Sequence, residues 1–412
     1  MLLQKKQNYS LNRKKNVFLQ TQTLSIMKNG LLVNALILVV MAMLAVGCQK
    51  DYETLHAELV DGETFCKNIP AKAKSVVFEC NSSYDKRGIN LSSRSSPVPV
   101  FGHLEGEVWC VTTRAGFLDA NPNSRKMFYN CSKLTSIKFG SGFNTSNVEH
   151  MDAMFYGCSG LTSLDVSNFN TSNVVSMTRT VDSILHYAGR TYNEIIRFGM
   201  FTGCSSLTSL DLSSFNTSKV TDMRGLLEGC NKLTSLNVSS FNTSNVQHMD
   251  AMFKGCSSLT SLDLSNFNTS NVVSMGYYVK VFSNSGSWGQ IQHSGHDDNG
   301  GMFMNRSSLT SLNISSFNTS NVTNMCKMFY NCTHLTFLDL SNFDMTLCNN
   351  KGDMCCGLST SSGACTIVCT ESVQNSLLEF YQYIAHDEDE EDIFYYYTGI
   401  PVDEVTFTWV RP

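Results

Sequence analysis

The chain has 412 residues, of which 42% are hydrophobic, 16% are charged and only 6 are proline, a composition that excludes disorder along its length. Residues 1–47 contain six basic and no acidic side chains, so the remainder carries 24 Lys and Arg against 35 Asp and Glu, a net charge of −11. A surface of this sign repels polyanions, and we therefore expect neither nucleic acid nor anionic lipid headgroups as partners.

The first predicted element is a secretion signal. Residues 31–46 form an apolar run, LLVNALILVVMAMLAV, that is shorter than the roughly 20 apolar residues of a membrane-spanning helix. The run ends in small residues and is followed by Gly47 and Cys48, an order that resembles a bacterial lipobox. The resemblance implies cleavage before Cys48 and a lipid on its thiol, whereas an uncleaved anchor helix is the alternative. The compact basic start of the signal predicts that translation begins at Met27.

The next segment, residues 48–126, is predicted to be a tether followed by a β-rich N-terminal cap. Its start, QKDYE after the cysteine, resembles the surface-export signal of Bacteroidetes lipoproteins, which implies the outer face of the outer membrane. Two runs have the composition and spacing of short strands, Ser75–Phe78 and Glu107–Val111. The serine-rich stretch 92–97 between them predicts a loop.

A unit of 26 residues recurs seven times through the middle of the chain, from residue 127 to 347. Its consensus is M-F-x-x-C-S-x-L-T-S-L-D-L-S-x-F-N-T-S-N-V-x-x-M, and the copies begin at Met127, Met154, Met200, Leu226, Met252, Met302 and Met328. A fixed period of this length indicates a solenoid, in which each unit buries its apolar face against its neighbours. We therefore expect an α/β solenoid, a leucine-rich-repeat-like horseshoe with a β-rich N-terminal cap and a mixed C-terminal cap.

Within one repeat the apolar spacing predicts a strand followed by a helical turn. The segment around Leu210 and Leu212 alternates apolar and polar residues, as in a strand with one buried face. Residues 216–219, NTSK, are turn formers. The apolar residues that follow have the spacing of one face of a helical turn: Val220, Met223, Leu226 and Leu227.

Equivalent residues of successive repeats are expected to stack into ladders. One ladder consists of cysteines: Cys131, Cys158, Cys204, Cys230, Cys256 and Cys332. We interpret their thiols as small core groups, because stacked parallel side chains do not face each other as a disulfide requires. Arg306 takes the place of the cysteine in the sixth repeat, which a required chain of metal ligands would not allow. The Asn-Thr-Ser triplets, such as residues 144–146, match a glycosylation sequon, but we interpret them as hydrogen-bonded turns.

The unit as a whole resembles the repeats of the BspA-family leucine-rich repeat surface proteins, closely from Met127 to about Asp344 and more loosely in the signal region and the C-terminal tail. The resemblance implies a secreted or lipid-anchored adhesin that binds host matrix proteins, other bacteria or surfaces. The family has no catalytic motif to carry over, so no catalytic residue is assigned.

Two repeats are interrupted at the same point, by the inserts 178–199 and 276–301. Inserts in repeat proteins project from one edge, which is often the binding edge. Stacking places the bases of the two loops about 14 Å apart. Aromatic side chains on loops are typical binding anchors, and the candidate binding residues are Tyr187, Tyr192, Tyr277, Tyr278 and Trp288. The alternative is that both inserts are tolerated surface loops whose aromatic residues pack on the repeats.

Three further groups have residue types found in binding sites. The second insert contains His293, His296, Asp297 and Asp298, which are metal-ligand types but are interpreted as part of a solvated loop. The acidic run 386–392 has calcium ligands and is likewise interpreted as a solvated loop. The exposed Ser-Asp-Ser positions of the strands form a polar strip, either a surface for a glycan or basic peptide or an ordinary solvated strand face. We therefore predict no metal site.

Residues 348–412 are predicted to form the C-terminal cap, with strands at 365–369 and 405–410 and a helix at 371–385. Five cysteines cluster in this segment: Cys348, Cys355, Cys356, Cys365 and Cys369. In an exported protein such a cluster favours disulfides over a zinc site.

The sequence contains no nucleophile–base pair, no phosphate-binding loop and no fixed carboxylate pair outside the repeat, so we expect neither an enzyme nor a cofactor. We predict a lipid-anchored, surface-exposed outer-membrane protein that mediates adhesion to host extracellular-matrix proteins, other cell-surface proteins or glycans. A lipoprotein that captures glycans or nutrients is the alternative, and an enzyme seated in the insert loops is a distant third. Because seven near-identical units offer the same surface seven times, we expect selectivity in the inserts.

Overall fold

The computed structural model describes residues 52–80, 88–187, 190–276, 280–282, 300–358, 365–382 and 405–409. The chain divides into two units, Met1–Tyr52 and Glu53–Pro412. The predicted signal and its cysteine, Cys48, lie outside the described residues. The elements below belong to the second unit, apart from the first residue of a short 3-10 helix, η2 (Tyr52–Thr54).

The N-terminal part of the second unit contains two sheets and a short helix. The strands and the helix are β1 (His56–Glu58), α3 (Gly62–Asn68), β2 (Ser75–Glu79), β3 (Ile89–Asn90), β4 (Val100–Glu105), β5 (Val108–Thr113), β6 (Phe117–Asp119), β7 (Ser136–Lys138) and β8 (Phe143–Asn144). The sheet orders are β3-β4-β5-β2-β7 and β1-β6-β8. Strands β2 and β5 confirm the two strands predicted in this segment. Strand β7 comes from the first repeat, so the larger sheet joins the cap to the repeats.

Helix α3 begins where the carboxylate of Asp61 accepts a hydrogen bond from the backbone N–H of Thr64, at 3.0 Å. The helix buries Phe65 against Phe78 of β2 and Phe128 of the first repeat, with ring centroids 5.7 and 5.8 Å apart. The ring of Phe128 in turn stacks on that of Phe155 at 5.4 Å. The aromatic core of the cap is therefore continuous with the core of the repeats.

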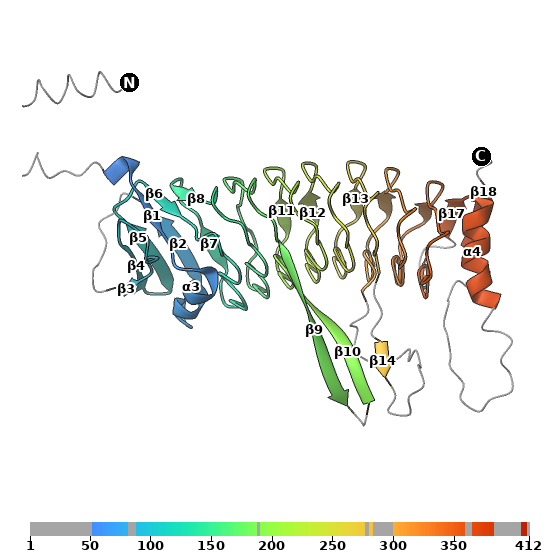
Figure 1. The fold of residues 1–412 in the computed structure, drawn as a ribbon, viewed down its shortest axis with the longest axis horizontal. Helices are drawn as coiled ribbons and strands as arrows, with labels where there is room; N and C mark the ends of the chain where they lie inside the picture. The colour runs from blue at the N-terminus through green and yellow to red at the C-terminus, as the bar shows by residue number, and fades with distance from the viewer. Residues whose placement is uncertain are drawn as a thin grey trace, which may run out of the picture. The chain divides into compact units, whose positions relative to one another are not determined.

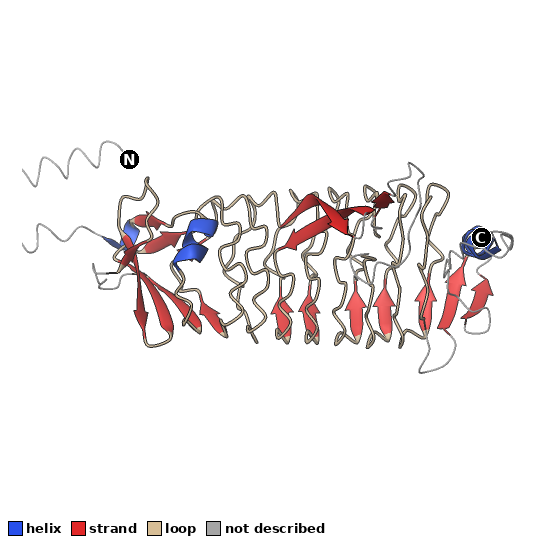
Figure 2. Ribbon diagram, turned by 90° about the horizontal axis from the view of Figure 1, so that it is seen from below, coloured by secondary structure: helices blue, strands red, loops and turns tan. Residues whose placement is uncertain are grey.

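Each of several repeats contributes one strand of three residues: β11 (Ser209–Asp211), β12 (Ser235–Asn237), β13 (Ser261–Asp263), β15 (Ser311–Asn313) and β16 (Phe337–Asp339). Strands β11 and β12 pair in parallel with Leu210 opposite Leu236. Strands β13 and β15 pair in parallel in the same way, with Leu262 opposite Leu312. These short strands line one side of a row of repeats (Figures 1 and 2). The strand predicted around Leu210 is confirmed, with this leucine buried between exposed neighbours.

The predicted α/β solenoid of the leucine-rich-repeat horseshoe type is wrong. Within the described residues, the α-helices are α3 and α4 (Glu371–Gln382), and neither lies in the repeats. The strands belong to separate sheets of two to five strands rather than to one continuous curved sheet. The repeats are built mainly of turns and are joined by backbone hydrogen bonds from one to the next.

The helical turn predicted in each repeat is absent because left-handed residues interrupt it. Gly225 and Gly229, four positions apart, have φ of 63° and 76°, outside the helical region. The backbone N–H groups of Gly225, Leu227 and Gly229 donate to carbonyls of the next repeat, at 2.8–2.9 Å. A backbone donor committed to a neighbouring repeat is not available for helical hydrogen bonds.

Five of the six ladder cysteines are buried in the core, which confirms their interpretation as packing features, whereas Cys131 at the N-terminal end is only partly buried. Cys158 is fully buried, and its Sγ donates to the backbone carbonyl of Phe128 in the preceding repeat at 3.0 Å. The same contact recurs at 3.2–3.3 Å for the later members Cys204, Cys230, Cys256 and Cys332. All of these thiols are free. Each one fills a small apolar site and satisfies a carbonyl between repeats.

The Asn-Thr-Ser triplets also connect repeats, as predicted for hydrogen-bonded turns. The hydroxyl of Thr217 donates to the carbonyl of Asn242 at 2.9 Å and accepts from the N–H of the same residue at 2.9 Å. The amide oxygen of Asn216 accepts from the N–H of Ser218 at 3.0 Å, closing the turn. Because the threonine is buried and used twice, the recurrence of this triplet follows from folding.

The C-terminal end adds β17 (Cys365–Cys369) beside β16, and β18 (Val405–Trp409) beside β17, all in parallel. These strands and α4 match the predicted strand–helix–strand order of the cap. Cys348, Cys355, Cys365 and Cys369 are buried, and Cys356 is partly buried. The five thiols are free in this structure, and closure of the cap by disulfides stays a prediction.

Candidate binding site

The two inserts, predicted as separate loops, combine into one antiparallel sheet. The first insert is a hairpin of β9 (Thr178–Tyr187) and β10 (Arg190–Gly199), paired from Thr178 opposite Gly199 to Tyr187 opposite Arg190. The second insert supplies β14 (Lys280–Phe282), which pairs with residues 191–193 of β10. The strand order is β14-β10-β9, and this sheet is called the insert sheet below.

The hairpin of the insert sheet extends away from the row of repeats (Figure 1). Strand β9 is ten residues long and forms one edge of the sheet, and no described strand pairs with its outer side. An edge strand presents unpaired backbone N–H and C=O groups, which are a template for pairing with another chain. The insert sheet therefore offers an extended binding edge.

The root of the hairpin is fixed to the repeats by a charged cluster. Arg197 of β10 is buried, and its Nε lies 3.2 Å from a carboxylate oxygen of Glu228, whose other oxygen lies 3.1 Å from Nζ of Lys254. Burial alone would raise the pKa of Glu228, but the charges of Arg197 and Lys254 outweigh it and lower the pKa. On the other strand, the hydroxyl of Thr180 accepts from Nη2 of Arg224 at 3.0 Å. Both strands at the root of the hairpin are thus fixed to the repeats that follow it in the chain.

A buried carboxylate stands beside the base of each insert, in the same arrangement twice. Ser176, just before the first insert, donates its hydroxyl to Asp152, and Ser274, just before the second, donates to Asp250. The two carboxylates are both buried. Each serine hydroxyl also contacts the backbone carbonyl that starts its insert, at 3.2 and 2.9 Å. In both places, a serine hydrogen-bonded to a buried aspartate therefore contacts and orients the first residue of the insert.

The two buried carboxylates differ in their cationic partners. Asp152 accepts from Nε of Arg125 at 2.6 Å. Arg224 occupies the equivalent place before Asp250, but its Nη2 donates to Asp222 at 2.6 Å. Burial raises the pKa of Asp250 to about 6, against the hydrogen bond from Ser274 and the charge of Arg224.

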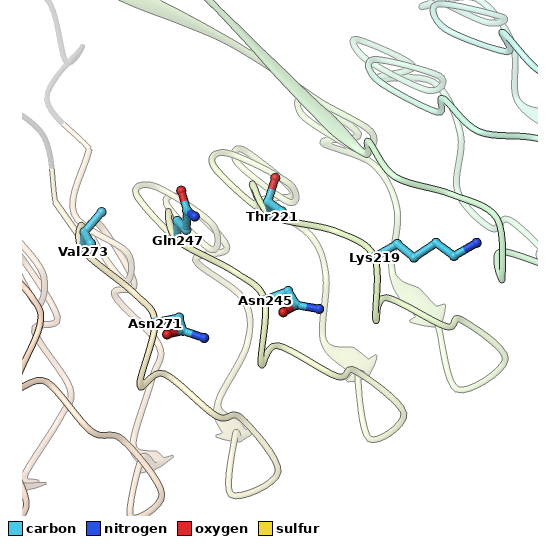
Figure 3. A pocket seen from close by; sticks show the side chains of 6 residues that line it. All are labelled: Lys219, Thr221, Asn245, Gln247, Asn271 and Val273. Atoms are coloured by element: carbon cyan, nitrogen blue, oxygen red, sulfur yellow. The ribbon is translucent and has the colours of Figure 1, made fainter.

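A polar groove of about 500 Å³ lies on the repeats between the two inserts (Figure 3). Two rows of three exposed side chains line it, one from each of three successive repeats: Lys219, Asn245 and Asn271, and Thr221, Gln247 and Val273. Each residue of the second row is followed in the chain by a residue that forms parallel β-bridges between repeats: Asp222 pairs with His248, and His248 pairs with Ser274. Ser274 stands at the base of the second insert. The groove and the insert sheet therefore belong to one region of the molecule.

The chemistry of the groove is that of an amide surface with one cation. The side-chain amides of Asn245 and Asn271 donate to backbone carbonyls of Ser218 and Ser244 at 2.7 Å, which directs their oxygens to serve as acceptors. Nζ of Lys219 donates to the amide oxygen of Asn173 at 2.9 Å and keeps further donor capacity. Such a groove can bind an extended polar ligand that carries hydroxyls, backbone amides or a carboxylate.

The predicted site residues fall partly within the described chain. Tyr187 stands at the tip end of β9, opposite Arg190, and Tyr192 lies in the middle strand, opposite Leu185 on one side and Val281 on the other. Tyr192 is therefore in the part of the sheet that both inserts build. The other candidates lie outside the described residues: Cys48, Tyr277, Tyr278, Trp288, His293, His296, Asp297 and Asp298.

The groove was missed at the sequence level, although two signals were present. Lys219 replaces an asparagine that occupies this position in the neighbouring repeats, and the change introduces the cation of the groove. Exposed valines, Val175 and Val273, precede the serine at each insert base. A second feature that the sequence did not predict lies in the N-terminal part. One potential metal-ligand atom from each of His103, Glu105 and Cys110 lies within 4.8 Å of the other two.

A family model described as "Mycoplasma protein of unknown function, DUF285" matches residues 122–190, 198–294 and 290–376, together more than half of the chain. The matches cover the repeats, strand β9 and the groove, and they leave out residues 191–197 of β10. No match to a curated protein or to a solved structure is found. Among the described residues, no helix has the length and apolar character needed to cross a membrane.

Proposed function

We propose that this chain, which belongs to the family described as Mycoplasma protein of unknown function, DUF285, is a surface-binding protein that mediates adhesion to host proteins or to other cells, and not an enzyme. The observation that carries the proposal is the insert sheet. Two segments far apart in the sequence interrupt an otherwise regular repeat and join each other through β10 and β14. A structure that is built from both interruptions and held by buried charges is a specific feature on a repetitive scaffold.

The cellular location is part of the proposal and is supported by the sequence. The lipobox-like order before Cys48 and the QKDYE segment after it favour a lipid-anchored protein on the outer face of the outer membrane. The resemblance of the repeats to BspA-family surface proteins favours an adhesive role. The net charge of −11 after residue 47 disfavours nucleic acid as a partner.

The proposed contact is the addition of an extended protein segment to the outer edge of β9. The ten residues of this strand can donate and accept backbone hydrogen bonds along the edge, which supplies affinity, whereas side chains on alternate faces supply specificity. The groove beside the insert sheet contributes polar contacts to the flanking residues of the partner. A protein ligand of this kind suits an adhesin.

The test replaces each insert by the two residues that join the corresponding methionines in a regular repeat. In one variant of the ectodomain 49–412, Asp-Ala replaces residues 178–199, and in a second, Asp-Ala replaces 276–301, as between Met151 and Met154. Both variants should bind at least tenfold more weakly than the parent to the matrix or cell-surface proteins that an array identifies. Circular dichroism and thermal melting confirm that the repeats still fold. Unchanged binding by both folded variants contradicts the proposal.

Capture of a glycan or another nutrient is the second candidate, and the groove favours it. Amide oxygens and an ammonium group along three repeats match sugar hydroxyls and acidic sugars, although the groove is not lined by aromatic side chains. Lys219→Asn restores the residue of the neighbouring repeats and should weaken binding of acidic glycans several-fold. If an array shows glycan binding only, with this dependence on Lys219, capture replaces adhesion to proteins as the function.

A further inference from the structure

We propose that His103, Glu105 and Cys110 form a binding site for a single zinc-like divalent cation on the N-terminal sheet. The site lies in the cap and is independent of the insert sheet, the groove and the proposed adhesive function. It follows from the geometry of one hairpin, formed by β4 and β5.

The hairpin brings the three side chains to one face of the sheet. Strands β4 and β5 are antiparallel, and His103 stands directly opposite Cys110. Glu105 follows His103 by two positions and therefore lies on the same face. One ligand atom from each residue lies within 4.8 Å of the other two. Zinc bonds of about 2.0 Å to nitrogen and about 2.3 Å to sulfur place tetrahedral ligands about 3.5 Å apart, so small side-chain rotations complete the site.

The imidazole of His103 has an unsatisfied nitrogen. Its Nε2 contacts a carboxylate oxygen of Glu105 at 3.0 Å, whereas its Nδ1 is buried and has no hydrogen-bond partner among the described residues. Leaving a buried polar atom without a partner costs free energy. A cation bound at Nδ1 would satisfy this atom, and the exposed carboxylate of Glu105 would then turn from Nε2 to the cation as the third ligand.

The negative charge around Cys110 favours the binding of a cation. The carboxylates of Glu105 and Glu79 place negative charge near the sulfur of Cys110. Two carboxylates thus act on the same sulfur, and a divalent cation would offset them while binding the thiolate. Histidine, cysteine and glutamate together are a donor set that suits zinc, and not calcium or magnesium, which prefer oxygen ligands alone.

The site opens to solvent on its carboxylate side. The side chain of Glu105 is 70% exposed, whereas that of His103 is 22% exposed. This gradient gives the cation a path of entry and leaves a fourth position for water. The bound cation would connect the two strands next to the tight turn at Gly106, which has a φ of 62°.

The experiment is a titration of the reduced, metal-free ectodomain with Co²⁺ and then Zn²⁺. We expect one equivalent of Co²⁺ to bind with a thiolate-to-cobalt absorption band that Zn²⁺ removes. Cys110→Ser should abolish the band, and Glu105→Gln should raise the Kd at least tenfold. Zn²⁺ should raise the melting temperature of the parent but not that of Cys110→Ser.

The controls separate this site from other cysteines. Cys365→Ser, in the C-terminal cap, should leave the band and its stoichiometry unchanged. Because Glu105 is exposed, Glu105→Gln tests the site even if Cys110→Ser does not fold. The proposal fails if the parent binds no Co²⁺ at micromolar concentration, or if the band survives Cys110→Ser or is lost in Cys365→Ser.

Discussion

The cysteine ladder shows how a single side chain sets the stability of a repeat. Arg306 occupies the place that a small thiol fills in the neighbouring repeats, and it is fully buried. Its Nε and both Nη atoms have no hydrogen-bond partner among the described residues. Its guanidinium carbon lies 5.8 Å from the ring centroid of Phe253, and burial lowers its pKa. A buried cation of this kind costs more free energy than the ring contact returns.

Arg306→Cys should stabilise the protein, because it removes the buried charge and restores the thiol-to-carbonyl contact seen in the other repeats. We expect the free energy of unfolding to rise by about 2 kcal/mol. Chemical denaturation of the ectodomain measures the change. Cys230→Arg, which places a second guanidinium in an equivalent site, is the opposite control and should destabilise by a similar amount or more. A destabilising Arg306→Cys would show that the guanidinium has a stabilising partner.

The carboxylate of Asp250 gives stability a specific pH dependence. Its pKa is about 6 in the folded protein, above the value of 3.8 expected for an unfolded chain. The folded state therefore binds more protons between these values, so stability contributed by this group falls as pH rises from about 4 to about 6. The shift corresponds to about 3 kcal/mol. Denaturation at several pH values should show this decline in the parent and not in Asp250→Asn.

The exposed strand residue Asp211 is the control for this pH effect. Hydrogen bonds from Ser213 lower the pKa of Asp211, so its contribution has the opposite sign and Asp211→Asn should leave the decline in place. If the parent and Asp250→Asn have parallel pH profiles between 4 and 6, the buried carboxylate is not the group responsible.

At the scale of elements, regular structure in this chain depends on contacts between repeats more than on local propensity. The three-residue strands were predictable because Leu210 and its equivalents alternate with polar residues. The absence of a helix was not, because Val220 and Met223 have helical spacing while Gly225 and the backbone bonds to the next repeat enforce turns. The apolar period alone does not distinguish a helical turn from a left-handed turn of similar length.

The insert sheet shows the same limit more strongly. The presence and position of the inserts were evident from the interrupted period, but the pairing of Tyr192 with Val281 joins segments far apart in the chain. Such non-local strand pairing leaves no mark in either segment alone. The groove likewise requires side chains from three repeats. In the row formed by Lys219, Asn245 and Asn271, Lys219 alone departs from the asparagine of the repeat consensus.

The charged cluster at the root of the hairpin, formed by Arg197, Glu228 and Lys254, is predicted to anchor the insert sheet to the repeats. Glu228→Gln leaves Arg197 and Lys254 close together without their shared anion. Because all three side chains are largely buried, we expect a loss of about 2 kcal/mol and faster amide hydrogen exchange in β9 and β10. Glu63→Gln, which breaks a surface ion pair with Lys67, is the control and should cost less than about 0.5 kcal/mol. Equal effects of the two changes would contradict an anchoring role for the root.

At the scale of the whole molecule, the repeats set the spacing between the two inserts, and this spacing decides whether β14 meets β10. Deleting residues 230–255 removes one 26-residue unit between the inserts while keeping Arg197 and Glu228. It also removes Lys254 and Asp250, so Glu228→Gln and Asp250→Asn serve as controls for the loss of their contacts. The inserts should then be one strand step, about 4.8 Å, closer. Deleting residues 306–331 removes one unit beyond both inserts and leaves their spacing unchanged.

Both deletion variants should fold, because each restores a junction of the repeat consensus and the row loses only one unit. The first should break the register in which Thr191 lies opposite Phe282, so amide exchange at residues 191–193 should become at least tenfold faster than in the parent. The second should retain the protection of the parent. If both deletions leave these amides equally protected, the inserts find each other independently of the scaffold. Loss of protection in the first alone means that the number of repeats between the inserts determines the structure of the proposed binding surface.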